Sequence, residues 1–213
     1  MLTVKTFTFN PVQENTYLLY NDQGDCCIID PGCYFDEEKN RLRQAIENAG
    51  LRPVLLLNTH CHLDHVFGNQ FVADTWGLQP HIHEKERPVL DRAAEAGLRW
   101  QLPFVNYTGP VHLLEAGDLV KLGGDSMSVL FTPGHSPGSI SFHNAAQHFV
   151  IGGDVLFQGS IGRTDLPGGD YDTLIDSIKT QLLPLPDDTI VYSGHGPATT
   201  IGRERRNNPF LQD

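Results

Sequence analysis

The segment Thr59–His65, with the sequence THCHLDH, constrains this chain more than any other stretch. It places three histidines and one aspartate within six residues, directly after the apolar run 54–57, which predicts a short buried strand. In extended backbone, residues two apart point the same way, so the first two histidines can bind one metal ion. Asp64 and His65 can then turn toward a second ion. Crowding these imidazoles at a strand end without a metal gains nothing, so the segment predicts a metal site.

Three further candidates each follow a predicted strand and lie in a turn. His135 lies in Pro-Gly-His-Ser-Pro, Asp154 follows two glycines, and His195 lies in Ser-Gly-His-Gly-Pro. Small neighbours let the backbone pack close to a site. The complete candidate set is His60, His62, Asp64, His65, His135, Asp154 and His195.

Five histidines and two aspartates suffice for two metal ions if one aspartate bridges them. A water held between the ions completes such a site, and zinc lowers the pKa of its water to about 7. We therefore expect two divalent ions, with zinc favoured and iron or manganese also compatible with these ligands. No Gly-x-Ser-x-Gly motif points to a serine nucleophile.

The amino-acid composition limits the kinds of molecule that the chain can bind. Hydrophobic residues make up 39% of the chain, enough for a core, and the net charge of −11 argues against nucleic acid and anionic membranes. No apolar signal region follows Met1, and no apolar run could span a bilayer, so we expect a cytoplasmic protein. The four cysteines are expected to be reduced thiols, and strand alternation points Cys61 away from the neighbouring histidines. The sequence leaves the oligomeric state open.

Alternating patterns and turn residues divide the chain into two β-rich halves that both contain helices. We expect strands over 4–9, 15–20, 26–29, 54–57, 80–83, 118–122, 127–132, 138–143, 148–152 and 189–192. We expect helices over 37–49 with Asp36 as N-cap, from the metal segment to Gly77, over 84–97, and over 171–183. Such halves predict an α/β (α+β) fold, a helix–sheet–sheet–helix sandwich, in one domain spanning 1–213. The aromatic segment 98–110 is either a packed loop or a lid.

With His60-x-His62-x-Asp64-His65 followed by the three later candidates, the sequence resembles the metallo-β-lactamase superfamily over nearly its whole length. The resemblance implies a four-layer αββα sandwich with two metal ions in a cleft between the sheets. It implies that one ion is held by His60, His62 and His135, the other by Asp64, His65 and His195, with Asp154 bridging both. It also implies that Asp30, in an Asp-Pro-Gly turn, supports the site from behind.

Within this superfamily the chain looks most like small glyoxalase II-like proteins of bacteria, through residues 153–157, 162–165, 193–200 and 204–210. Lactamases of the superfamily carry a cysteine where Asp154 stands, which speaks against β-lactam hydrolysis. Full-length glyoxalase II enzymes add a C-terminal helical region that contacts glutathione, and a Lys and a Tyr shortly after the bridging aspartate. Here only residues 196–213 follow His195, which leaves specific recognition of glutathione open.

The resemblance implies a binuclear hydrolase that acts on a small thioester, such as S-lactoylglutathione, through a metal-bridging hydroxide. Asp64 would be the catalytic group that orients or takes up a proton. The alternatives are a mononuclear iron persulfide dioxygenase using His60, His135 and Asp154, a hydrolase of another small ester or lactone, and a binding module without activity. Arg163 either binds a substrate carboxylate or forms a surface ion pair, for example with Asp165 or Asp170.

Overall fold

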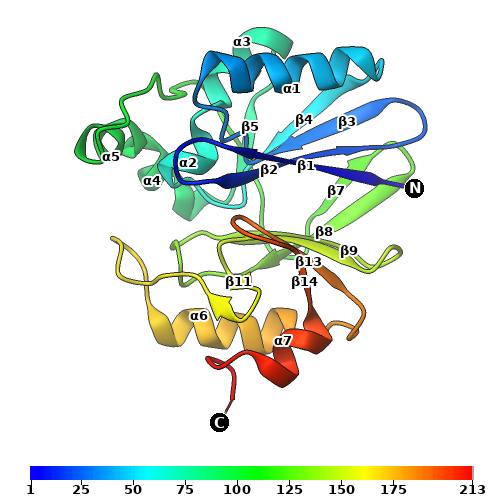
Figure 1. Ribbon diagram of the computed structural model, residues 1–213, viewed down its shortest axis with the longest axis vertical. Helices are drawn as coiled ribbons and strands as arrows, with labels where there is room; N and C mark the ends of the chain where they lie inside the picture. The colour runs from blue at the N-terminus through cyan, green and yellow to red at the C-terminus, as the bar shows by residue number, and fades with distance from the viewer. Residues whose placement is uncertain (213) are drawn as a thin grey trace.

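The computed structural model describes residues 1–212 and arranges them in four layers, helix, sheet, sheet and helix (Figure 1). The first sheet has the strand order β1 (Thr3–Phe9), β2 (Glu14–Tyr20), β3 (Asp25–Ile29), β4 (Arg52–Leu57), β5 (Pro80–Ile82) and β6 (His112–Leu113). The second has the order β14 (Thr199–Thr200), β13 (Ile190–Ser193), β10 (Phe149–Gly153), β9 (Ile140–Asn144), β8 (Asp125–Phe131) and β7 (Leu119–Leu122). The predicted αββα sandwich is confirmed.

Local sequence explains the first sheet well. The three N-terminal strands pair as antiparallel neighbours, as expected from the short turns between them. Strand β3 then leads through α1 (Asp36–Asn48) into β4, which pairs parallel to β3 and completes a strand–helix–strand unit. Helix α1 begins one residue earlier than predicted, and Asp36 is not its N-cap. The carboxylate of Glu38 instead accepts the backbone N–H groups of Tyr34 and Phe35.

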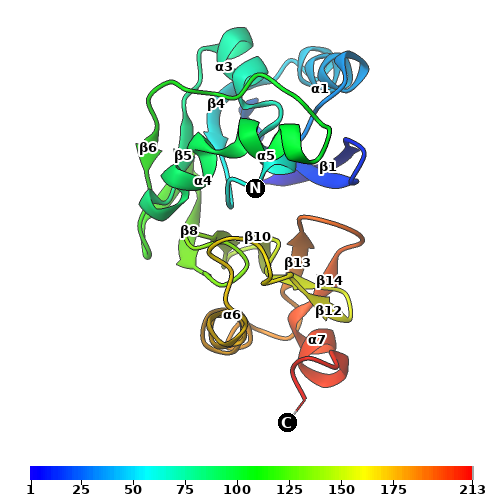
Figure 2. The same cartoon turned by 90° about the vertical axis from the view of Figure 1, so that its left-hand side faces the viewer.

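Three hydrophobic layers hold the sandwich together. Leu19, Leu57 and Phe142 belong to the core between the two sheets. The outer face of the first sheet packs on α1 and α3 (Asn69–Trp76), and that of the second on α6 (Tyr171–Ser177) and α7 (Ile201–Asn207), as Figures 1 and 2 show. Full burial of one such side chain stabilises the fold by roughly 1.5–3 kcal/mol.

Two predicted helices differ from the structure. The expected helix over 84–97 is broken into a 3₁₀ turn, η1 (Glu84–Glu86), and two helices, α4 (Arg87–Asp91) and α5 (Ala93–Arg99). Pro88 explains the first break, because proline fits the first turn of a new helix but not the interior of a longer one. The helix expected over 171–183 continues from α6 into a π-helical turn, η2 (Ile178–Leu182).

The sequence reading omitted several short elements. They are β6, β14, α2 (Leu63–Val66), α7 and the hairpin of β11 (Leu156–Phe157) with β12 (Ser160–Ile161). Most are too short to show a period in their sequence. The longest helix among residues 1–212 is α1, and none there has the length and apolar character needed to cross a bilayer.

Candidate metal centre

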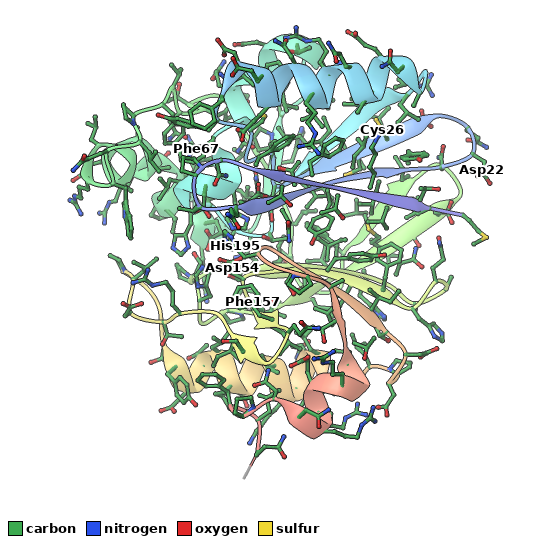
Figure 3. All side chains as sticks on the ribbon, viewed as in Figure 1. Asp22, Cys26, Phe67, Asp154, Phe157 and His195 are labelled. Carbon is green, nitrogen blue, oxygen red and sulfur yellow. The ribbon has the colours of Figure 1, made fainter. Side chains whose placement is uncertain are left out.

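The predicted ligands meet where four strands end. His60 and His62 follow β4, with Asp64 and His65 next to them on α2. The other three follow β8, β10 and β13, and they are His135, Asp154 and His195. The structure therefore brings all seven predicted side chains together. Figure 3 shows Asp154 and His195 near each other between the two sheets.

The side chains form two triads. In the first, His60, His62 and His135 each offer a ring nitrogen, and these atoms lie within 4.8 Å of one another. In the second, ligand atoms of Asp64, His65 and His195 lie within the same limit. The grouping is the one that the family resemblance implies.

Asp154 lies between the two triads. Its Oδ2 is 3.5 Å from Nε2 of His135 in the first triad and 3.5 Å from Nε2 of His195 in the second. Its Oδ1 is 3.4 Å from Nε2 of His65. A β-carbon on Gly194 would lie 2.1 Å from the Asp154 carboxylate, so only glycine permits this approach of the His195 turn.

Hydrogen bonds at the back of the imidazoles fix the direction in which the rings face. Nδ1 of His135 contacts the backbone carbonyl of Arg163 at 2.7 Å, and Nδ1 of His195 contacts that of Gln13 at 3.2 Å. These contacts leave Nε2 of each ring directed at the centre. The His62 ring instead directs its Nδ1 at the centre, where this atom lies 2.8 Å from Nε2 of His135.

Asp30 lies behind the centre, as the resemblance implies. Its carboxylate accepts hydrogen bonds from the N–H and the hydroxyl of Thr59, at 2.7 and 2.6 Å, and contacts Nδ1 of His65 at 3.1 Å. The Thr59 hydroxyl also lies 3.1 Å from Nδ1 of His60. Asp30 thus orients one ring from each triad. Ligand atoms of Asp30, His60 and His65 also lie within 4.8 Å of one another, but these hydrogen bonds already occupy the oxygens of Asp30.

The donor atoms fit metal ions. Nε2 of His60, Nε2 of His65 and Oδ1 of Asp154 are buried without a hydrogen-bond partner, which is costly unless a cation binds them. Burial lowers the pKa of His60 and His135, and together with His135 it lowers the pKa of His62 to about 3. These rings are neutral at physiological pH, which is the form that binds metals. Burial opposes the ionisation of Asp154, but the neighbouring His65 holds its pKa well below the usual range. In the second triad burial opposes protonation, but the carboxylates of Asp154 and Asp64 raise the pKa of His65 and His195, so a metal ion would displace protons there. Imidazole nitrogens with anionic oxygens suit zinc, iron or manganese.

A cleft of about 430 Å³ opens onto this centre. His62, Asp64, His135, Asp154 and His195 form its floor. Its walls are largely apolar, formed by Val12, Leu63, Trp100, Leu102, Phe157, Ile161 and Leu166. The cleft can therefore hold the apolar part of a small molecule against the ligand candidates.

The aromatic segment 98–110 borders the cleft at its start and is a packed loop further on. Trp100 and Leu102 line the cleft. Beyond them the segment is packed, since the ring of Phe104 meets that of Phe67 at 4.8 Å and the Tyr107 hydroxyl donates to the Pro110 carbonyl.

Arg163 also lines the cleft, but its guanidinium pairs with Asp165 at 2.6 and 2.7 Å on the surface. The surface ion pair expected as one alternative is present. Its backbone, rather than its side chain, contacts His135.

The side chains of the four cysteines, His81 and His83 lie outside the centre. All four cysteines are free, as predicted, and they are also buried; the side chain of Cys61 packs with Val66 and Leu90. His81 stacks on His112, and neither it nor His83 lines the cleft.

The sequence reading missed two buried glutamates near the centre. Glu14 begins β2, and its Oε1 lies 4.0 Å from Nδ1 of His65. Glu86 ends η1 and contacts both loops of the first triad. Nothing local in the sequence distinguishes either one from an exposed glutamate, because the contacts that place them near the centre come from residues distant along the chain.

The sequence and the fold of this chain are similar to those of known proteins. The family model of the Metallo-beta-lactamase superfamily matches residues 9–195. The chain is 41% identical to hydroxyacylglutathione hydrolase GloC of Haemophilus influenzae, over 99% of this chain and 98% of that protein. It also resembles the crystal structure of BLEG-1 B3 metallo-beta-lactamase, with a TM-score of 0.91 and 42% identity over 99% of this chain and 100% of that one. The structure of TTHA1623 in a di-iron-bound form gives a TM-score of 0.88 and 40% identity, over 98% and 100% of the two chains.

Proposed function

Because the chain belongs to the metallo-β-lactamase superfamily, we propose that it is a binuclear metal-dependent hydrolase of small thioesters of the S-acylglutathione class. In this proposal His60, His62 and His135 hold one ion, Asp64, His65 and His195 hold the other, and Asp154 bridges both. Zinc is the favoured metal, and the di-iron form of TTHA1623 supports iron as the next choice.

The position of Asp154 carries the proposal. One carboxylate lies within 3.5 Å of imidazole nitrogens from both triads, which is the arrangement that two adjacent ions require. The similarity to GloC supports the thioester substrate, since it extends over nearly all of both chains. A cytoplasmic location would suit such a substrate and stays a prediction.

Two bound ions would supply a water of lowered pKa and would polarise the thioester carbonyl. The residues of the chain do the rest. The apolar walls with Trp100 and Phe157 hold the acyl or thiol part of the substrate and exclude water. Asp64 lines the cleft, and its Oδ2 lies 3.1 Å from Nε2 of His195. We propose that this carboxylate orients the attacking water and takes up its proton, while the thiol leaves as a thiolate.

A spectrophotometric assay with S-lactoylglutathione tests the proposal. We expect metal-dependent release of glutathione that is lost on chelation and restored by zinc. The similarity to BLEG-1 makes β-lactam hydrolysis a second candidate, so a chromogenic cephalosporin is assayed beside the thioester. Simple esters and lactones complete the panel. Efficient turnover of the cephalosporin or a lactone with none of the thioester would contradict the proposed substrate class.

Arg163→Ala tests the role of the guanidinium in the cleft. We expect the KM for an anionic thioester to rise a few-fold, because one cation at the rim is lost. Metal content should not change, since the contact with His135 comes from the backbone carbonyl of Arg163. Asp165→Asn serves as the matched control, because it breaks the same ion pair and leaves the cation in place. Equal, unchanged KM values for both variants would assign Arg163 to the surface alone.

A further inference from the structure

Glu86 is a fully buried carboxylate that the proposed chemistry does not use. It is the last residue of η1 and its exposed fraction is 0%. Burying a carboxylate is costly unless its oxygens are well hydrogen-bonded. The positions of its partners therefore indicate what the residue does.

All the donors to Glu86 come from the two loops that carry the first triad. Oε2 accepts the backbone N–H of Cys61 at 2.7 Å, and Cys61 lies between His60 and His62 in the chain. Oε1 accepts the Ser136 hydroxyl at 2.6 Å and the backbone N–H of Gly138 at 2.7 Å. One carboxylate thus joins the loop after β4 to the loop after β8.

Close packing fixes Glu86 against the second of these loops. A β-carbon on Gly138 would lie 2.8 Å from the backbone nitrogen of Glu86 and 2.9 Å from its Cγ. On the other side, Cys61 and Ile82 belong to one buried apolar cluster, which holds the first loop beside the strand that precedes η1. Both loops therefore have little freedom to move relative to Glu86.

We propose that Glu86 is a positioning residue that holds the loops of His60, His62 and His135 in the separation needed to bind one of the two ions. This inference rests on the proposed binuclear function. It assigns Glu86 to one ion only, because its partners do not include the loops of His65 or His195.

Glu86→Gln separates this role from simple space filling. An amide has one oxygen, so it cannot accept on both sides as the carboxylate does. If its oxygen faces Gly138, its NH₂ group opposes the N–H of Cys61; if it faces Cys61, the N–H of Gly138 loses its acceptor. In either orientation one buried backbone donor is left unpaired and one loop is released.

Glu204→Gln is the matched control. Glu204 is also buried, and it accepts hydrogen bonds from the Gly159 N–H, the Thr199 hydroxyl and the Asn208 amide on the far side of the second sheet. Both variants lose hydrogen bonds of a buried carboxylate, so both should lose some stability. Only the Glu86 variant should change metal binding.

The experiment titrates the metal-free full chain with Co²⁺ and follows the visible absorption of the bound ion. Wild type and Glu204→Gln should each take up two equivalents with the same affinities. Glu86→Gln should keep one equivalent unchanged and bind the other at least about tenfold more weakly, with an altered spectrum, as expected when support behind ligands is lost. If Glu86→Gln does not fold, Ser136→Ala, which removes one of the three hydrogen bonds, should weaken the same equivalent by a smaller factor.

The outcomes separate the two proposals. A wild-type chain that binds fewer than two Co²⁺ ions would overturn the binuclear function and this inference with it. A wild type with two ions and a Glu86→Gln variant that titrates identically would overturn the inference alone. Equal weakening of both ions in Glu86→Gln and Glu204→Gln would also overturn it, because that result marks a general loss of stability.

Discussion

Asp154→Ala is expected to lose binuclear metal binding and thioester hydrolysis together. One oxygen of this carboxylate lies 3.5 Å from an imidazole nitrogen of each triad, on His135 and on His195. Its removal leaves each triad short of one ligand. We expect kcat/KM to fall by more than about 10³-fold, or ~4 kcal/mol of transition-state stabilisation.

Elemental analysis and steady-state kinetics on the same preparation check this result. Asp25→Ala is the control, because Asp25 is similarly buried, with 14% of its side chain exposed against 11% for Asp154, and pairs with Arg52 away from the cleft. Two retained ions and full activity in Asp154→Ala would mean that the bridge is assigned to the wrong residue.

Asp30→Asn is expected to weaken metal binding about 10–100-fold without unfolding the chain. The substitution leaves one oxygen where two now accept from Thr59 and contact His65, so one ring from each triad loses orientation. Asparagine is the appropriate choice because Asp30 has a φ of 49°, a conformation that asparagine tolerates. Competition with a chromogenic chelator measures the affinity.

Thr59→Ser and Thr59→Val provide the matched pair for Asp30. Serine keeps the hydroxyl that joins Asp30 to Nδ1 of His60, and valine removes it at similar volume. Metal affinity should be retained in Thr59→Ser and reduced in Thr59→Val. If Asp30→Asn and Thr59→Val both bind metal like wild type, hydrogen bonds behind the rings do not orient the ligands.

The αββα layers followed from patterns that are local in the sequence. Strand alternation, turn residues and the amphipathic helix α1 lie within short windows, and each of the seven ligand candidates directly follows a predicted strand or lies on the turn after it. Their convergence could be expected because strands of both sheets end at the same edge. Seven candidate metal ligands at strand ends leave few other arrangements.

What the sequence did not reveal depends on contacts between distant residues. Glu86 lies 25 residues from Cys61 and 50 from Ser136, so its hydrogen bonds have no local signature. Pro88 makes the break of the helix over 84–97 visible in the sequence, but the sequence has no comparable signal for the burial of Glu86. Segment 98–110 has no hydrophobic periodicity in its sequence. Which of its residues pack and which line the cleft becomes clear only from three-dimensional contacts, such as that of Phe104 with Phe67.

The number of metal ions per chain tests the central claim most directly. Elemental analysis of protein prepared with excess zinc, and separately with iron, gives this number without any assumption about the substrate. The two triads with Asp154 between them predict close to two equivalents of metal per chain. A single firmly bound iron, unchanged by excess metal, would contradict the binuclear hydrolase and favour the mononuclear dioxygenase.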